Sequence, residues 1–214
     1  MPPSPQETAQ IVALLEEHYP SARTSLDFAD PFQLLVSTVL SAQCTDERVN
    51  KVTPALFARF PDARALASAD LAELEQLIRP TGFFRNKAKN LKAAAQMMVA
   101  DFQGQVPDNL ADLVKLPGVA RKTANVVLGA AFNIPGVVVD THVKRVAGRL
   151  GWTSSQNPEK IERQLMAIWP RESWTKLGFQ VIIHGRSLCQ ARRPQCSRCF
   201  LKTLCDFGKK EIGR

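Results

Sequence analysis

Helix-start signals recur along the whole chain and limit its fold more than any other feature. Ser4-Pro5-Gln6-Glu7 has the form of a capping box with proline at the first helical position, and Asp30-Pro31 opens a second apolar stripe. Apolar residues at helical spacing predict further helices over residues 46–59, 68–78, 84–102, 108–115, 119–132, 141–150, 158–169 and 172–188. The β-like run at 137–139 is too short to build a sheet. We therefore expect an all-α fold.

Cysteine is concentrated at the C-terminal end of the chain. Four of the five cysteines lie in the last 26 residues, in the C-x6-C-x2-C-x5-C pattern of Cys189, Cys196, Cys199 and Cys205. The N-terminal residues lack the features of a secretory signal, so we expect a cytoplasmic protein, whose thiols stay reduced and available to a metal. Zinc normally uses two close ligand pairs, and only Cys196 and Cys199 form one here. The spacing favours an iron–sulfur cluster and leaves zinc open.

The loop between the first two of these cysteines is short and basic. It is too short to fold alone, so we expect a metal to order it and to present Arg192 and Arg193 for phosphate contacts. The alternative is that these arginines only offset the negative charge of a thiolate-bound cluster. The remaining cysteine, Cys44, falls in a helical region and is expected to be a small core residue.

The positive charge of the chain is unevenly distributed. The net charge is +8, but residues 1–30 carry one arginine against five acids, whereas residues 115–149 sum to +5 and residues 185–214 to +6. Segregated charge of this kind indicates a polyanionic partner, because neutralised phosphates release counterions. A generally basic, solvated surface is the alternative. No apolar run approaches the length of a membrane helix, so we expect no membrane association.

A tight turn between two helices is predicted over residues 112–124. Pro117-Gly118 ends the first helix, and the second begins close after it. Amide N–H groups exposed at a helix start, together with the helix dipole, can hold a phosphate, and glycine allows a close approach of the DNA backbone. The expected DNA-contacting residues of this hairpin are Leu116, Pro117, Gly118, Val119, Ala120 and Arg121.

These motifs together resemble the endonuclease III family of DNA glycosylases and abasic-site (AP) lyases. The resemblance rests on L-P-G-V-x-R-K-T-A at the hairpin, Val139-Asp140-Thr141-His142, the cysteine pattern, Leu40-Ser41-Ala42-Gln43, Gly82-Phe83-Phe84 followed by Lys87-Ala88, and His184-Gly185-Arg186. It implies a [4Fe–4S] cluster and two helical domains with a DNA cleft between them. Residues 24–133 would form a six-helix barrel with the helix-hairpin-helix motif, and residues 1–23 with 134–214 a discontinuous cluster domain.

The resemblance also assigns catalytic roles to two residues. It implies that Lys122 attacks C1′ of the damaged nucleotide, expels the base and forms a Schiff base, from which β-elimination cuts the strand; only an amine can form that imine. Asp140 would activate the lysine or stabilise positive charge on the sugar. Considered alone, Lys122 would be a solvated lysine in the first turn of a helix and Asp140 an N-cap.

Further residues are expected to contact an extruded nucleotide or the duplex around it. By resemblance, Gln43 and Phe83 lie on loops that enter the duplex, although the family more often has leucine at the second position and Phe83 alone suggests a buried loop anchor. His142 is assigned to phosphate or to Asp140, with a packed structural histidine as the alternative. Ala120 stands where the family's hairpin usually has glycine; we expect it to be already helical and to tolerate its methyl group.

The function that the resemblance implies is base excision repair. We expect a monomer in the bacterial cytoplasm, associated with the nucleoid, that removes oxidised pyrimidines such as thymine glycol, dihydrouracil and 5-hydroxycytosine from double-stranded DNA and cuts at the abasic site. Three alternatives stay open: a monofunctional adenine glycosylase of the same fold, which Lys122 disfavours; a noncatalytic DNA-binding protein with a structural metal cluster, which Asp140 disfavours; and a zinc-containing regulator.

Overall fold

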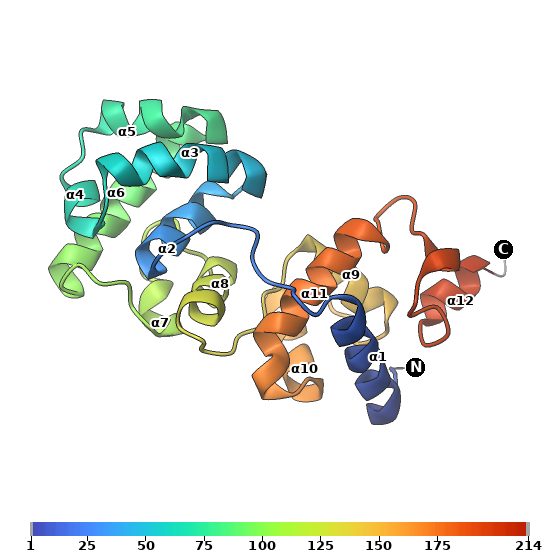
Figure 1. The fold of residues 1–214 in the computed structure, drawn as a ribbon. Coiled ribbons are helices and arrows are strands. Elements are labelled where there is room, and N and C mark those ends of the chain that lie inside the picture. Colours follow the sequence, from blue (N-terminus) through green and yellow to red (C-terminus); the bar gives the residue numbers. More distant parts are fainter. Residues whose placement is uncertain (1, 213–214) are drawn as a thin grey trace. The chain divides into compact units, whose positions relative to one another are not determined.

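The computed structural model describes residues 2–212, and its regular secondary structure there is entirely helical (Figure 1). The chain divides into two compact units, residues 24–134 and residues 1–23 with 135–214. The predicted all-α class is confirmed for the described residues. Among them, no helix combines the length and the apolar character needed to cross a lipid bilayer.

The unit of residues 24–134 is built around a buried helix, α2. Its helices are α2 (Pro31–Leu40), α3 (Asp46–Arg59), α4 (Ala63–Ala67), α5 (Leu71–Ile78), a 3₁₀ turn (Arg79–Thr81), α6 (Phe84–Asp101), α7 (Leu110–Leu113) and α8 (Arg121–Ala131). Eight of the ten residues of α2 are buried, and α2 packs against α3, α6 and α8 (Figure 1). A helix that is apolar on all sides is stable only inside a core. The surrounding helices supply that core.

The unit of residues 1–23 and 135–214 is organised by α11. Its helices are α1 (Pro5–His18), α9 (Thr141–Arg149), α10 (Pro158–Ile168), a 3₁₀ turn (Arg171–Ser173), α11 (Trp174–Ser187), a second 3₁₀ turn (Cys196–Arg198) and α12 (Asp206–Ile212). α11 packs against α1 and α9. Glu16 on α1 accepts hydrogen bonds from Lys176 and, at 2.8 Å, from Gln180. These bonds join the first helix of the chain to one that lies about 160 residues later.

Local capping signals predicted most helix boundaries correctly. Ser4 and Glu7 form the expected capping box, with reciprocal bonds of 2.8 and 3.2 Å, and α3 spans the predicted residues 46–59. The helix predicted over 68–78 is present as α5, which begins three residues later because Asp70 is its N-cap. Asp62 caps a separate short helix, α4, before it. α4 and α12 were missed because such short helices carry too few apolar positions to show a period.

Replacing Asp30 with alanine should lower the free energy of unfolding by about 1 kcal/mol. The first turn of α2 would lose the carboxylate oxygen that accepts the N–H of Gln33 at 2.8 Å. Urea unfolding curves measure this change. Asp108→Ala is the control, because Asp108 is exposed and forms no hydrogen bond or ion pair within residues 2–212, so its effect should stay within about 0.5 kcal/mol. Equal losses in the two variants would contradict the capping role of Asp30.

Candidate functional site

The segment between α7 and α8 forms the predicted hairpin. The turn closes where the N–H of Val119 donates to the carbonyl of Leu116 at 3.0 Å. The side chains of Leu116 and Val119 are 1% and 5% exposed, so both anchor the turn to the core of their unit. Only their backbone groups remain as possible DNA contacts. The surface of the hairpin is formed by the half-buried Pro117 and the exposed Gly118, Ala120 and Arg121.

Two residues of the hairpin differ in what their backbone permits. Gly118 has φ +80°, and a Cβ there would lie 2.9 Å from the Cβ of Asn90, so both conformation and space require glycine. Ala120 was expected to be helical, and this is wrong. It is the extended N-cap of α8, with φ −83° and ψ 164°. That φ is ordinary for any L-residue, so the methyl group of Ala120 is tolerated because the backbone is extended, and not because it is helical.

The N-terminus of α8 places Lys122 on an open surface. No side chain caps this helix, so the N–H groups of its first turn are not satisfied in the usual way. Lys122 is the second residue of α8; it is exposed and forms no hydrogen bond or ion pair within residues 2–212. A primary amine and a positive helix end therefore occupy the same surface. That combination suits a nucleophile that acts beside phosphate.

Asp140 is the N-cap of α9, as its alternative assignment predicted. Its Oδ1 accepts the N–H groups of His142 and Val143, both at 2.8 Å. The cap uses only this oxygen, and Oδ2 forms no hydrogen bond within the described part of the chain. Asp140 is half-buried. One oxygen thus holds the carboxylate in place and the other is left for chemistry.

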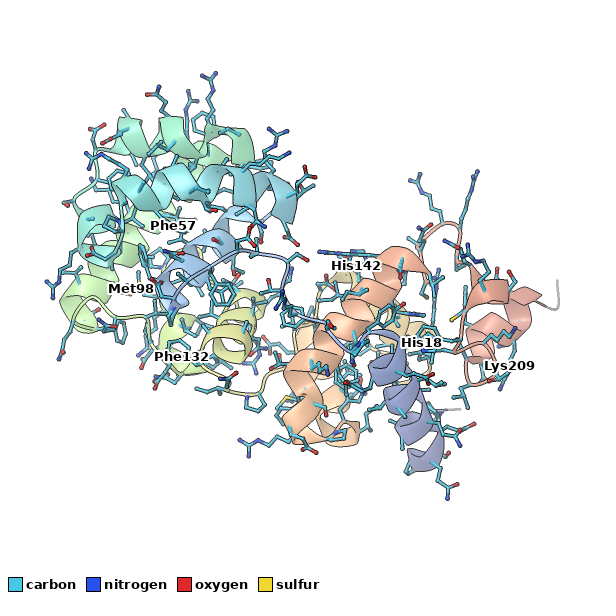
Figure 2. All side chains as sticks on the ribbon, viewed as in Figure 1. His18, Phe57, Met98, Phe132, His142 and Lys209 are labelled. Carbon is cyan, nitrogen blue, oxygen red and sulfur yellow. The ribbon has the colours of Figure 1, made fainter. Side chains whose placement is uncertain are left out.

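His142, labelled in Figure 2, is half-buried in the first turn of α9. Its Nδ1 lies 3.1 Å from a guanidinium nitrogen of Arg145, and a Cβ on Gly185 of α11 would lie 3.0 Å from the Cβ of His142. Burial lowers the pKa of His142, and the positive charges of Arg145 and Arg186 lower it further against the opposing effect of Asp140. His142 is therefore neutral at neutral pH. These contacts favour a structural role, and a phosphate contact would have to come from a neutral ring.

Gln43 and Phe83 share an unusual backbone conformation. Both are exposed, Phe83 at 64%, and both have left-handed φ values, 55° and 48°. The exposure of Phe83 excludes the alternative of a buried loop anchor. Left-handed conformations are uncommon for residues other than glycine and mark turns or functional strain. Gln43 follows α2 and Phe83 is the N-cap of α6, so both sit at helix ends of the same unit.

The four C-terminal cysteines line a single cavity. Its wall also includes Arg149, His184, Leu188, Leu201 and Phe207. Burial raises the pKa of the Cys199 thiol to about 11 and those of Cys196 and Cys205 above their usual range. A bound metal requires thiolates, so metal binding at this cavity would release protons. Within residues 2–212, no three His, Cys, Asp or Glu side chains are grouped so as to hold a single metal ion.

Two arginines of α9 hold the start of the cysteine loop. Arg149 donates to the carbonyls of Gln190 at 2.7 Å and Ala191 at 3.0 Å, and to Cys189 Sγ at 3.2 Å. Arg145 donates to the carbonyl of Cys189 at 3.1 Å. Sequence reasoning missed this function, although both residues belong to the basic stretch 115–149. Their only signal is spacing, since residues four apart share one face of a helix.

A buried histidine also contacts the cysteine loop and was not assigned a function from the sequence. His184 is 2% exposed, and its Nε2 lies 3.7 Å from Cys199 Sγ while its Nδ1 lies 3.2 Å from the Tyr19 hydroxyl. Burial lowers its pKa to about 4. Its position five residues before Cys189 is the sequence feature that could have indicated a contact with the cysteine loop. His184 thus links α1 and α11 to the loop.

The remaining predicted residues have clear positions. Arg192 and Arg193 are exposed and form no hydrogen bond or ion pair within the part of the chain that the structure describes. Both are therefore available for phosphate, whereas Arg149 contacts a cysteine sulfur. The expectation that Cys44 is a helical core residue is wrong. α2 ends at Leu40, and Cys44 lies half-exposed in the connection to α3.

Comparisons with known proteins agree with this arrangement. Residues 36–171 match the family model of the HhH-GPD superfamily base excision DNA repair protein. The Endonuclease III of Synechocystis sp. is 55% identical over 95% of this chain and 94% of its own length. A solved non-covalent complex of Endonuclease III with DNA superposes with a TM-score of 0.93 at 42% identity, covering 99% of both chains. A trapped covalent Endonuclease III–DNA intermediate gives the same TM-score and identity over 98% and 99%.

Replacing Gly118 with alanine should destabilise the protein by at least about 1 kcal/mol, because alanine is strained at positive φ and its Cβ meets Asn90. Duplex binding should weaken as well, since the turn must shift. Thermal and urea unfolding measure the stability, and fluorescence anisotropy measures the affinity.

The matched control for this variant is Ala120→Gly in the same hairpin. Glycine is acceptable at an N-cap, so the unfolding free energy should stay within about 0.5 kcal/mol of the parent value. An unchanged stability of Gly118→Ala would show that the left-handed turn is not required.

Proposed function

Because this chain belongs to the endonuclease III family, within the HhH-GPD superfamily of base excision DNA repair proteins, we propose that it removes oxidised pyrimidines from double-stranded DNA. The chain is a DNA glycosylase and AP lyase. The proposed lesions are thymine glycol, dihydrouracil and 5-hydroxycytosine, and the abasic site is a substrate in its own right. The observation that carries the proposal is the exposed amine of Lys122 in the first turn of the uncapped helix α8.

Lys122 is the proposed nucleophile. Its unprotonated nitrogen attacks C1′ of the extruded nucleotide, the N–C1′ bond forms, and the glycosidic bond breaks with its electron pair leaving on the base. Opening of the sugar ring then gives the Schiff base. Loss of a proton from C2′ and cleavage of the C3′–O bond complete the β-elimination on the 3′ side. The N–H groups of α8 and the turn at Gly118 would hold the adjacent phosphates.

Asp140 is the proposed acid–base partner. The attack requires a neutral amine, and a carboxylate can accept the ammonium proton or stabilise positive charge on the sugar. Its Oδ1 is occupied by the cap of α9, so Oδ2 is the oxygen proposed to act. A capping carboxylate has little rotational freedom, which limits the entropy lost in catalysis.

DNA contacts are proposed for residues of both units. We propose that residues 24–133 and residues 1–23 with 134–214 are the two functional domains, the first carrying Lys122 and the second carrying Asp140 and the cysteines. Gln43 and Phe83 would fill the gap left by the extruded nucleotide. Further phosphate contacts are proposed for Arg192 and Arg193, with a secondary contact from His142. Since one chain carries every proposed catalytic group, we propose a monomer that works on the nucleoid in the bacterial cytoplasm.

We propose that the four C-terminal cysteines hold a [4Fe–4S] cluster. A zinc ion would require four sulfurs about 2.3 Å from one point, whereas in a cluster each thiolate binds a different iron. The four thiols line one cavity, which supports a shared metal centre, and the spacing of the cysteines favours the cluster. When bound, the cluster supplies a cross-link between Cys189 and Cys205. Arg149, 3.2 Å from Cys189 Sγ, would offset part of its negative charge.

Lys122→Gln should abolish borohydride trapping and strand cleavage, because an amide cannot form the imine. Affinity for the same DNA should change by no more than about threefold, since phosphate contacts supply most of the binding. Trapping on duplexes that contain thymine glycol, dihydrouracil or an abasic site measures the chemistry, and undamaged duplex provides the baseline.

The control for the nucleophile is Lys51→Gln. Lys51 is an exposed lysine that pairs with Glu47 at 2.6 Å, and its variant should be trapped like the parent. Strand cleavage by Lys122→Gln at the parental rate would make the nucleophile assignment wrong. Activity on abasic DNA without activity on the oxidised bases would retain the lyase and reject the proposed lesions.

Cys199→Ser should remove the brown colour and lower the iron and sulfide content of the purified protein, because serine oxygen is a poor ligand for an iron–sulfur cluster. Cys44→Ser is the control. Cys44 lies outside the cavity, so this variant should keep the colour and the iron and sulfide content of the parent. Visible absorption and metal analysis measure the outcome. A colourless parent protein that contains stoichiometric zinc would reject the cluster.

A further inference from the structure

Lys87 is a buried lysine to which the proposed mechanism gives no role. It lies in the first turn of α6 and is only 6% exposed. Its Nζ donates to the carbonyl of Leu40 and to the carbonyl of Thr81, both at 2.8 Å, and it forms no ion pair among residues 2–212. Burial lowers the pKa of Lys87, and the nearby Cys44 thiol opposes this shift. A buried ammonium without a carboxylate is costly, so its presence requires a reason.

The two acceptors of Lys87 mark the ends of two helical elements. Leu40 is the last residue of α2, and Thr81 is the last residue of the 3₁₀ turn Arg79–Thr81. Carbonyls at helix ends lack intrahelical partners, and a cation is favoured there by the helix dipole. One nitrogen therefore joins two segments of chain that are 41 residues apart in sequence.

Each of these helical ends leads directly into one of the left-handed residues. Gln43 follows Leu40 by three positions, and Phe83 follows Thr81 by two. We define the wedge loops as residues 41–45 and 79–83. One wedge loop follows the Leu40 carbonyl and the other contains the Thr81 carbonyl, and both carbonyls accept from the same ammonium. A displacement of one loop therefore strains the hydrogen bond to the other. Lys87 thus couples the positions of Gln43 and Phe83.

Stabilisation alone is the alternative role for Lys87. An apolar side chain of similar length would fill the same space, but it would leave the carbonyls of Leu40 and Thr81 without this donor. Lys92, on the same helix, shows the simpler case: its Nζ donates to one carbonyl, that of Ala69, at 2.7 Å, and it is less deeply buried. Neither wedge loop contains Ala69. Lys92 therefore provides a matched comparison for Lys87.

We propose that Lys87 is a positioning residue that holds the two wedge loops in a fixed relation, so that Gln43 and Phe83 enter the duplex as one unit. The inference rests on the proposed role of these two residues in filling the gap. It predicts that Lys87 matters for reactions that require a base to leave an intact duplex. It also predicts that Lys87 is dispensable where no base has to be displaced, because Lys122 and Asp140 are not among its contacts.

The test compares two reactions of the purified holoprotein. The first is base removal from a duplex with one thymine glycol, and the second is strand cleavage at a preformed abasic site in single-stranded DNA. Lys87→Met should slow the first by about tenfold, equivalent to about 1.4 kcal/mol, and leave the second within about twofold. Lys92→Met should change neither by more than about twofold. Thermal unfolding confirms that both variants are folded at the assay temperature.

A double-variant cycle with Phe83→Ala separates positioning from general destabilisation. If Lys87 acts through the wedge loops, Lys87→Met should slow base removal by no more than about twofold once Phe83 is already alanine. If Lys87→Met is unfolded, Lys87→Arg takes its place under the same criteria, because its planar fork keeps the charge and alters the geometry of the two bonds.

Three outcomes would overturn the inference. They are an unchanged rate of base removal in the Lys87 variant, an equal loss in both reactions, and a multiplicative loss in the cycle with Phe83→Ala. Failure of the proposed function has a different signature, because the parent protein itself would then leave both substrates intact. In that case the wedge assignment and the role of Lys87 fall together.

Discussion

The backbone groups that a helix leaves unsatisfied at its two ends are the constraint on which this structure depends. An all-α chain has no sheet edge, so its unpaired N–H and C=O groups are concentrated at helix termini. The proposed catalytic pair stands at such termini, because Lys122 lies at the uncapped start of α8 and Asp140 caps α9. Lys87 donates to a carbonyl at the end of α2, and Arg149 donates to a carbonyl of the cysteine loop. The site therefore uses groups that the fold has to satisfy in any case.

Positive charge in this protein has two different uses that its sequence does not distinguish. Arg145 and Arg149 donate hydrogen bonds to carbonyls of the cysteine loop. These bonds help to hold a loop that is too short to fold alone. Arg192 and Arg193 remain exposed on that loop. Arg145 and Arg149 thus stabilise the loop that exposes Arg192 and Arg193 to solvent. The net charge of +8 therefore overstates what is available to a polyanion.

The part of the fold that could be predicted from the sequence is the part determined within a few residues. Capping by Ser4, Asp30 and Asp140 depends on contacts two or three positions away, and these boundaries were predicted correctly. The extended conformation of Ala120 and the exposure of Cys44 depend on where neighbouring helices stop. The contact of Arg149 with Ala191 spans 42 positions. No local pattern encodes such pairings, because they arise only when α9 and the loop pack together.

The left-handed residues of the unit of residues 24–134 show how ordinary helix termination differs from functional strain. Gln103 and Asn133 also have positive φ, but each follows a helix, and the next N–H returns to a helix carbonyl: Gly104 to Met98 at 2.8 Å and Ile134 to Leu128 at 3.0 Å. Such an ending satisfies carbonyls that the helix leaves unpaired, and these hydrogen bonds offset the free-energy cost of the left-handed residue.

Gln43 and Phe83 have no such return bond. The N–H of Cys44 reaches only Ser41, three residues back, and Phe83 precedes its helix instead of ending one. A left-handed conformation costs about 1–2 kcal/mol per residue and persists only where the surroundings impose it. Lys87 binds the carbonyls of Leu40 and Thr81, which stand three and two residues before these positions, and it is the contact proposed to hold both loops. The strained backbone therefore carries the two exposed side chains that are proposed to enter the duplex.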